Sequence, residues 1–395
     1  METTSVIQNP QRKQQKLNEE EDIDKKSKSL GNLPQEILRH ILSFLPTKDA
    51  VRISLVSKSC EYLWASIPNL DFNVCRISRD KKRMRTPLFE RTLFMNFVDR
   101  VLCLRDSSDI KRFTLCCDVL HDASRLHTWI SAAIKHNVQE LKIDLENFKG
   151  EFSLPYCLFT CRTITSLHLC MPCILKLPTA ISFSNLQILT IIKVAFSDEC
   201  LTQKLFNGLS NVEFLRLSSD VVEVRAELLP HLPMFKNLKN LSIDGLPVNL
   251  GNEALLKILQ RSPCLENLEF FTGIELSSDS EEANRILYPV PSCFLSHLKC
   301  IKVNPFPSYL LNWIKVNCND EVEKMLSAIK ILLKKAFVLE EIIIFSVKHR
   351  GWNMDKQLKA KACKQLIEFP RVSQNCKIVL EWYDYSAKKE CRIVL

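Results

Sequence analysis

The residues best suited to chemistry are two cysteines with a histidine close by. Cys170 and Cys173 form the only CxxC sequence of the chain, and His168 precedes them. Such a pair supports disulfide exchange at a helix N-terminus, or binds zinc together with a second ligand pair. Here the pair follows an expected strand, contains Pro172, and has no second ligand pair at a suitable spacing. We therefore expect packed structural thiols and no metal site; an enzyme built on these three residues is the alternative.

No other motif points to catalysis. The patterns GxxxxGK[ST], GxGxxG, HExxH and GxSxG are absent, and the chain has only 7 glycines. The 8 histidines are scattered, and none has an evident serine or cysteine partner. The carboxylates of Glu340 and Glu341 are adjacent but lie in or beside an expected strand. The sequence therefore predicts a protein that is not an enzyme and needs no cofactor.

The composition is that of a globular intracellular protein. The 395 residues are 46% hydrophobic and 25% charged, enough for two or three units. The net charge of +9 is modest for this length, so we do not expect a nucleic-acid partner. The 17 cysteines are irregularly spaced, residues 1–24 lack the apolar core of a secretory signal, and no apolar run approaches the ~18 residues that span a bilayer. We expect no membrane contact and a reducing location, in the nucleus, the cytoplasm or both.

A weak repeat begins near residue 110. Each unit contains two apolar residues separated by one, which would point to the same face of a strand. Six of the seven spacings lie between 22 and 28 residues, the period of leucine-rich repeats. The pattern predicts an irregular solenoid of parallel strands, with an ordinary α/β domain as the alternative. The pairs are Phe113/Leu115, Leu141/Ile143, Leu167/Leu169, Leu189/Ile191, Leu215/Leu217, Leu241/Ile243, Leu268/Phe270 and Ile301/Val303.

Residues that flank and separate these pairs should point to the other, inner face of the sheet. They mix both charge signs with a few aromatic residues, as protein-recognition surfaces do, and show no uniform basic stripe. Phe214, Arg216 and Phe271 are hot-spot candidates by residue type. We therefore expect this face to bind an unidentified target protein; the alternative is that the residues are merely solvated. The candidate target-binding residues are Lys142, His168, Phe214, Arg216, Ser242, Asp244, Glu269 and Phe271.

An amphipathic helix is expected between Pro34 and Pro46. At roughly 100° per residue its apolar side chains fall within an arc of about 160°. A second helix would follow with Thr47 as its N-cap, and a third would run from 57 to 66. Three short helices bury little apolar surface, so part of the arc is expected to dock onto another protein. Packing against the rest of its own chain is the alternative.

The stretches LPQEIL (33–38), ILSFLPTKDAV (41–51), LVSK (55–58) and LW (63–64) strongly resemble the F-box. IPNLDF (67–72) is similar to the plant subfamily that carries leucine-rich repeats and a C-terminal FBD segment. The resemblance implies docking to a Skp-like adaptor and, through it, to a cullin. Where the family usually reads Ser-Lys-Arg-Trp, this chain has Ser57, Lys58, Ser59 and Cys60, which bears on adaptor affinity. The implied adaptor contacts are Leu33, Pro34, Ile37, Leu38, Ile41, Leu42, Leu55, Val56, Ser57, Lys58 and Trp64.

A strand–helix–strand order is expected after the repeats, with the helix at 319–336 and the second strand at 339–345. LLKKAFVLE (332–340) resembles the FBD segment of the same subfamily. This unit could close the open end of the solenoid, as every stack of repeats requires. A last helix at about 355–368 and a last strand at 376–382 would complete the cap.

The predicted fold class is α/β with an all-α N-terminal module. The predicted domains are a disordered tail at 1–28, the F-box at 29–75, a linker and capping helices at 76–104, leucine-rich repeats at 105–285, an FBD segment at 286–370, and a C-terminal strand and tail at 371–395. The basic run at 25–28 is either part of the tail or a nuclear signal, and that at 79–85 either a solvated linker or a phosphate-contacting patch.

The predicted function is that of a substrate-recognition adaptor in an SCF-type E3 ubiquitin ligase. The chain would act as a non-catalytic subunit that holds a target near the ubiquitin-conjugating enzyme. One alternative is an F-box scaffold without ligase work, and another is a nucleic-acid-associated nuclear protein that uses residues 79–85. The target, and its need for a phosphate or a small-molecule glue, are not encoded in any recognisable motif.

Overall fold

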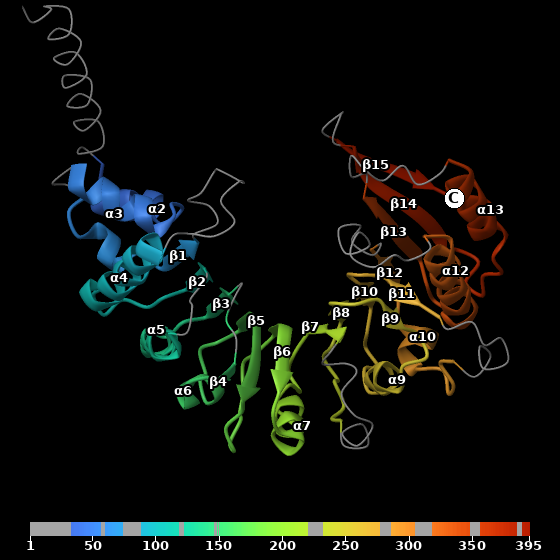
Figure 1. Cartoon of the computed structure of the whole chain (residues 1–395), viewed down its shortest axis with the longest axis horizontal. Helices are drawn as coiled ribbons and strands as arrows, with labels where there is room; N and C mark the ends of the chain where they lie inside the picture. Colours follow the sequence, from blue (N-terminus) through green and yellow to red (C-terminus); the bar gives the residue numbers. More distant parts are fainter. Residues whose placement is uncertain are drawn as a thin grey trace, which may run out of the picture. The chain divides into compact units, whose positions relative to one another are not determined.

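The computed structural model describes residues 33–56, 60–73, 88–117, 122–145, 148, 150–219, 232–276, 286–304, 318–347, 356–384 and 389–395 (Figure 1). The predictions for the tail at 1–28, for the basic run at 79–85, and for Ser57 and Lys58 lie outside these residues. The chain divides into two compact units. Unit 1 comprises Met1–Cys117 and Ala132–Gln139, and unit 2 comprises Asp118–Ser131 and Glu140–Leu395.

Unit 1 begins with two short helices, α2 (Gln35–Leu42) and α3 (Thr47–Val56). The carbonyl of Pro34 accepts the first backbone hydrogen bonds of α2, and that of Pro46 accepts those of α3, so the two prolines set both helix starts. In place of the helix predicted at 57–66, the described part of this segment contains the 3₁₀ turn η2 (Leu63–Ser66). Helix α2 packs against η2.

Thr47 is not the N-cap that the sequence predicts, because α3 already begins at this residue. Its side chain is fully buried, and its hydroxyl oxygen accepts a hydrogen bond of 2.7 Å from the backbone N–H of Asp71. Asp71 belongs to β1 (Asn69–Asn73), a strand within the segment expected to be all-α. Thr47 therefore joins the helices to a strand.

Strand β1 pairs in parallel with β2 (Arg112–Cys117), which carries the first predicted apolar pair. Phe113 lies opposite Leu70, Leu115 lies opposite Phe72, and all four side chains are buried. Helix α4 (Leu88–Leu104) lies within the range predicted for capping helices. Its Phe97 ring lies edge-on to Phe72, at 6.0 Å between ring centroids.

Unit 2 is built on a sheet whose spatial order is the chain order, which is the arrangement of a solenoid. Neighbouring strands are parallel up to β14, and β15 is antiparallel. The strands are β3 (Glu140–Leu145), β5 (Ser166–Lys176), β6 (Ile188–Phe196), β7 (Phe214–Ser218), β8 (Asn240–Asp244), β10 (Asn267–Phe270), β12 (Cys300–Val303), β13 (Glu341–Val347), β14 (Lys377–Asp384) and β15 (Lys389–Val394). Short strands β4 (Glu151–Ser153), β9 (Val248–Asn249) and β11 (Ile274–Glu275) lie in the connections.

The predicted apolar pairs define the register of this sheet. The first members of successive pairs are aligned as direct partners, from Leu141 through Leu167, Leu189, Leu215, Leu241 and Leu268 to Ile301. All of these side chains are at most 2% exposed. A one-residue slip would turn every pair away from the core, so the alternation fixes both register and face.

Helices in the connections lie on the core side of the sheet, as α7, α9 and α12 do in Figure 1. They are α5 (Ala123–Lys135), shared between the two units, and α6 (Tyr156–Phe159), α7 (Glu199–Asn207), α9 (Glu253–Gln260), α10 (Ser292–Ser296), α12 (Cys318–Lys335) and α13 (Lys356–Glu368). Three asparagines spaced 26 residues apart fix the loops before the strands. The amides of Asn185, Asn211 and Asn237 donate to the carbonyls of Arg162, Ser184 and Ser210.

The strand–helix–strand order predicted after the repeats is present as β12, α12 and β13. These strands continue the same parallel register, with Ile301 opposite Ile342 and Ile342 opposite Ile378. The segment therefore extends the repeat sheet rather than forming a separate layer over its end. Strand β15 then reverses direction at the end of the described strand order.

Candidate functional site

Cys170 and Cys173 lie within strand β5 and not after it, which corrects the predicted position of the CxxC sequence. The pairing of β5 with β6 shifts register between them, and both side chains are buried. Burial is the main reason that the pKa of the Cys170 thiol rises to about 11, and it raises that of Cys173 to about 12. A reactive cysteine needs a lowered pKa, so both thiols are in the wrong environment for nucleophilic chemistry. Among the described residues, no group of three His, Cys, Asp or Glu side chains could hold a metal ion.

The first candidate surface is a row of exposed apolar side chains on and beside α2. Leu33, Ile37, Ile41 and Phe44, which we call the α2 stripe, are 39%, 48%, 40% and 73% exposed. Ile37 and Ile41 are four residues apart and lie on one face of α2, and Leu33 and Phe44 flank the helix at its two ends. The His40 ring lies edge-on to Phe44 with 4.8 Å between centroids, so the stripe has a polar neighbour.

Three of the implied adaptor contacts are buried within unit 1. Leu38, Leu42 and Trp64 are 1%, 2% and 8% exposed, because α2 turns this side toward η2 and the core of unit 1. Leu33, Pro34, Ile37 and Ile41 are exposed as that prediction requires. The side chains of Leu55, Val56, Ser57 and Lys58 lie outside the description. Phe44 was missing from the implied set, although its position three residues after Ile41 indicates the same face.

The second candidate surface is the inner face of the sheet in unit 2. Its middle row places Lys142 opposite His168, and Arg216 opposite Ser242, which in turn lies opposite Glu269. Phe214 begins β7 next to Ile188, which is 43% exposed. Ile188 was missed, although it flanks the buried pair of β6 as Phe214 flanks that of β7. Together they form a small apolar area beside the polar row.

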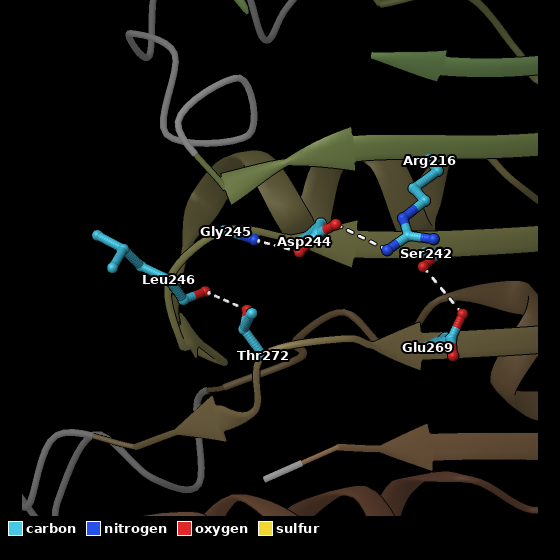
Figure 2. A network of polar contacts seen from close by, with 7 residues as sticks. All are labelled: Arg216, Ser242, Asp244, Gly245, Leu246, Glu269 and Thr272. Carbon is cyan, nitrogen blue, oxygen red and sulfur yellow. Dashed lines mark hydrogen bonds and ion pairs between the residues drawn. The ribbon is translucent and has the colours of Figure 1, made fainter. Parts of the chain in front are cut away.

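Five of the predicted residues form a connected set, the inner-face network: Arg216, Ser242, Asp244, Glu269 and Phe271. Arg216 Nη2 donates to Asp244 Oδ2 at 2.7 Å, and the Ser242 hydroxyl donates to Glu269 Oε2 at 3.0 Å (Figure 2). The Arg216 guanidinium also lies 4.0 Å from the centre of the Phe271 ring. The Arg216 and Asp244 side chains are 23% and 15% exposed, so solvent screens this pair only in part.

A tight turn after β8 holds Asp244 in position. The second carboxylate oxygen of Asp244 accepts from the N–H of Gly245 at 2.8 Å (Figure 2). The N–H of Leu246 donates to the Ser219 hydroxyl, and the carbonyl of Leu246 accepts from the hydroxyl of Thr272. Gly245 has φ of +112°, and a Cβ there would lie 2.6 Å from Ser219 Oγ, so only glycine fits this turn.

His168 is neutral on this face at physiological pH. Burial is the main cause that lowers its pKa to about 4; the charges of Lys142 and Arg216 lower it further, and Asp144 opposes them. The permanent cations of the predicted target-binding set are therefore Lys142, which is exposed, and Arg216, which is already paired.

Two family models match separate parts of this chain. The F-box domain family model matches residues 30–72. The model described as FBD-associated F-box protein At5g56370, LRR repeats, matches residues 126–220. The putative F-box/LRR-repeat protein At5g38386 of Arabidopsis thaliana is 31% identical over 299 residues, which cover 60% of this chain and 73% of that protein. This chain belongs to the F-box/LRR-repeat family.

Other members of the F-box/LRR-repeat group match shorter parts. The F-box/LRR-repeat protein At3g59190 of Arabidopsis thaliana is 36% identical over 146 residues, 37% of each chain. The putative F-box protein At3g58820 of the same plant is 30% identical over 292 residues, 60% of this chain and 70% of that protein. Among solved structures, the leucine-rich repeat-containing protein LegL7 from Legionella pneumophila aligns at a TM-score of 0.31 and 14% identity, covering 89% of this chain and 82% of that chain.

Members of the F-box/LRR-repeat family generally act as non-catalytic substrate adaptors, and an F-box generally implies a Skp-type partner. The α2 stripe lies within the residues that match the F-box, and Lys142, His168, Phe214 and Arg216 lie within those that match the repeats. No helix among the described residues is long and apolar enough to cross a bilayer.

Proposed function

We propose that this F-box/LRR-repeat protein is the substrate-recognition adaptor of an SCF-type E3 ubiquitin ligase. It binds a Skp-like adaptor, and through it a cullin, by the α2 stripe, and a target protein by the inner face of its repeat sheet. One observation carries the proposal: unit 1 completes its own core with Leu38 and Leu42, yet leaves Leu33, Ile37, Ile41 and Phe44 exposed on the same helix and its flanks.

Burial of an exposed apolar row of this kind against a partner lowers the free energy of the complex. Burying the exposed part of each side chain contributes on the order of 1 kcal/mol, at about 25 cal/mol per Å² of apolar surface. Four adjacent side chains therefore supply several kcal/mol, the scale of a hot-spot cluster. An amphipathic helix commonly binds by placing such a row in a groove of its partner.

The chain itself contributes proximity and no bond chemistry. Holding a target lysine near a charged conjugating enzyme turns an encounter between two molecules into a reaction within one complex. This requires two separate binding surfaces on one chain, which the α2 stripe and the inner face provide. The raised pKa values of Cys170 and Cys173 agree with a role that uses neither of these two thiols.

The deciding experiment is binding of the Ile41→Glu variant to a purified Skp-like adaptor. Ile41 is 40% exposed, so the charge should reduce adaptor affinity at least a hundredfold without lowering the thermal midpoint of the chain. Ile367→Glu is the matched control, because Ile367 is 57% exposed on helix α13 of unit 2. Equal adaptor binding by wild type and Ile41→Glu would refute the docking surface. Leu38→Glu is unsuitable, since it would bury a charge in the core of unit 1.

A ligase subunit and a simple scaffold would use the same two binding surfaces. Only the ligase subunit would support ubiquitin transfer to a bound protein. Reconstituted with adaptor, cullin and conjugating enzymes, the wild-type chain should support ubiquitin transfer to a bound protein, and Ile41→Glu should not. Adaptor binding without transfer to any protein that accumulates when the chain is removed would favour the scaffold.

We also propose an intracellular location, in the nucleus, the cytoplasm or both. The 17 cysteines are odd in number and irregularly spaced, a pattern that favours a reducing compartment. Fractionation of cells that express the tagged chain tests this proposal, and recovery from the secreted fraction would contradict it.

A further inference from the structure

Arg216 is only partly satisfied by its own chain. Its Nη2 donates to Asp244, but its Nε is buried and has no hydrogen-bond partner among the described residues. The hydroxyl of Ser218, two residues further along the same face of β7, is also buried and lacks a partner there. Ser218 is 1% exposed. Buried donors without acceptors are rare, and each calls for an explanation such as a missing ligand group.

Asp244 cannot supply what Arg216 lacks. A carboxylate binds a guanidinium most strongly when both of its oxygens accept from the fork of N–H groups. Here one oxygen accepts from Arg216, and the other accepts from the N–H of Gly245 at 2.8 Å. Turning both oxygens toward Arg216 would break the bond that shapes the turn. The ion pair of 2.7 Å is therefore a single-nitrogen contact that a better-placed carboxylate can improve on.

One aromatic side chain lies beside this cation. Phe271 stacks on the Arg216 guanidinium at 4.0 Å and is still 41% exposed. An aromatic side chain held by stacking loses little conformational entropy when a partner binds, which favours recognition.

We propose that Arg216 is the anchor for one acidic side chain of an extended target segment, and that Asp244 is an internal place-holder which that side chain displaces. Phe271 then contacts an apolar side chain next to the acidic one. The inference rests on the proposed function, because it names the class of segment that the inner face recognises. Asp244 and Glu269 flank the anchor with negative charge, so they disfavour segments with several carboxylates.

The test is selection of a random 12-residue peptide library, displayed on phage, against the full chain purified with its adaptor. Arg216→Gln serves for counter-selection, and Lys239→Gln is the matched control, because Lys239 also pairs across strands, with Glu213 at 3.0 Å. Peptides with a single Asp or Glu beside Leu or Phe should be enriched. Arg216→Gln or Phe271→Ala should weaken their binding at least tenfold, and Lys239→Gln should leave it unchanged.

The Asp244→Asn variant tests whether Asp244 is a place-holder that a target carboxylate displaces or a residue that only supports the turn. The asparagine keeps the side-chain oxygen that accepts from Gly245 but loses the charge that holds Arg216. Binding of the enriched peptides should tighten about threefold or more. Weaker binding to Asp244→Asn, enriched peptides without an acidic residue, equal binding to Arg216→Gln, or no enrichment at all would overturn the inference. Adaptor binding by Arg216→Gln should be normal, so these outcomes are distinct from failure of the α2 stripe.

Discussion

The α2 stripe and the inner-face network, the two proposed binding surfaces, differ in the chemistry of the side chains that they expose to water. The stripe exposes apolar side chains to solvent, whereas the network consists mainly of polar side chains that already pair with one another across strands. An unpartnered apolar row supplies affinity, and a self-paired polar surface supplies selectivity, because a target must replace contacts that already exist. The proposed adaptor surface is therefore visible as exposed apolar side chains, whereas the side chains of the proposed target surface are already paired within the chain.

The largest expected effect tests whether the two sides of α2 differ as described. Leu42→Ala should lower the free energy of unfolding of unit 1 by about 2–5 kcal/mol, because Leu42 is 2% exposed and its loss leaves a cavity. Ile41→Ala should cost well under half as much, since Ile41 is 40% exposed. Urea unfolding of both variants measures the difference. Similar losses would mean that the stripe is part of the core.

On the inner face, Gly245→Ala should cost about 1–3 kcal/mol, from the strained φ of +112° together with the contact of its Cβ with Ser219. Gly150→Ala is the control, because Gly150 has φ of +103° but nothing within 4 Å of an added Cβ. The difference in thermal midpoint between the two variants isolates the contact from the strain. Equal midpoints would show that Ser219 moves aside freely and that the turn is not rigid.

The stability of unit 2 should depend on pH through His168. Its folded pKa of about 4 lies below the ordinary 6.5, so the unfolded chain gains this proton first as the pH falls. The contribution is fully present above pH 6.5 and declines toward pH 4, by on the order of 1 kcal/mol once solvent screening is allowed for. Urea midpoints at pH 7 and pH 4.5 should therefore differ less for His168→Gln than for wild type. An identical pH dependence in both would contradict the assignment.

The smallest effect is expected for Lys239→Gln. Lys239 and Glu213 pair at 3.0 Å, but their side chains are 49% and 46% exposed, and exposed pairs contribute little. The thermal midpoint should not change measurably. A clear drop would mean that cross-strand ion pairs outside the inner-face network also stabilise the sheet, and the contrast between paired and unpaired surfaces would weaken.

Much of the repeat sheet could be predicted, because its signal is local. Two apolar residues separated by one define the buried face, and the predicted pairs from Leu141/Ile143 to Ile301/Val303 share one register. The candidate residues were harder to judge, because their state depends on the neighbouring repeat. Arg216 meets Asp244 28 residues later, and no local pattern shows that the two side chains neutralise each other.

The F-box segment shows the same limit. Its helical arc is readable from spacing, but Leu38 and Ile37 are equally apolar, and only packing against η2 assigns one to the core and the other to solvent. The hydroxyl of Thr47 was predicted to cap its own helix and instead accepts from Asp71, in a strand that the helical pattern did not indicate.

The residues alone predict a row of parallel strands, an amphipathic first helix and a resemblance to a family. These features can be predicted because apolar periodicity and short motifs are local patterns of neighbouring residues. Only the tertiary structure decided which apolar side chains stay exposed, which charges are already paired, and that His168 is neutral on the inner face. Those properties depend on burial and on distances between side chains a full repeat apart, which sequence spacing does not contain.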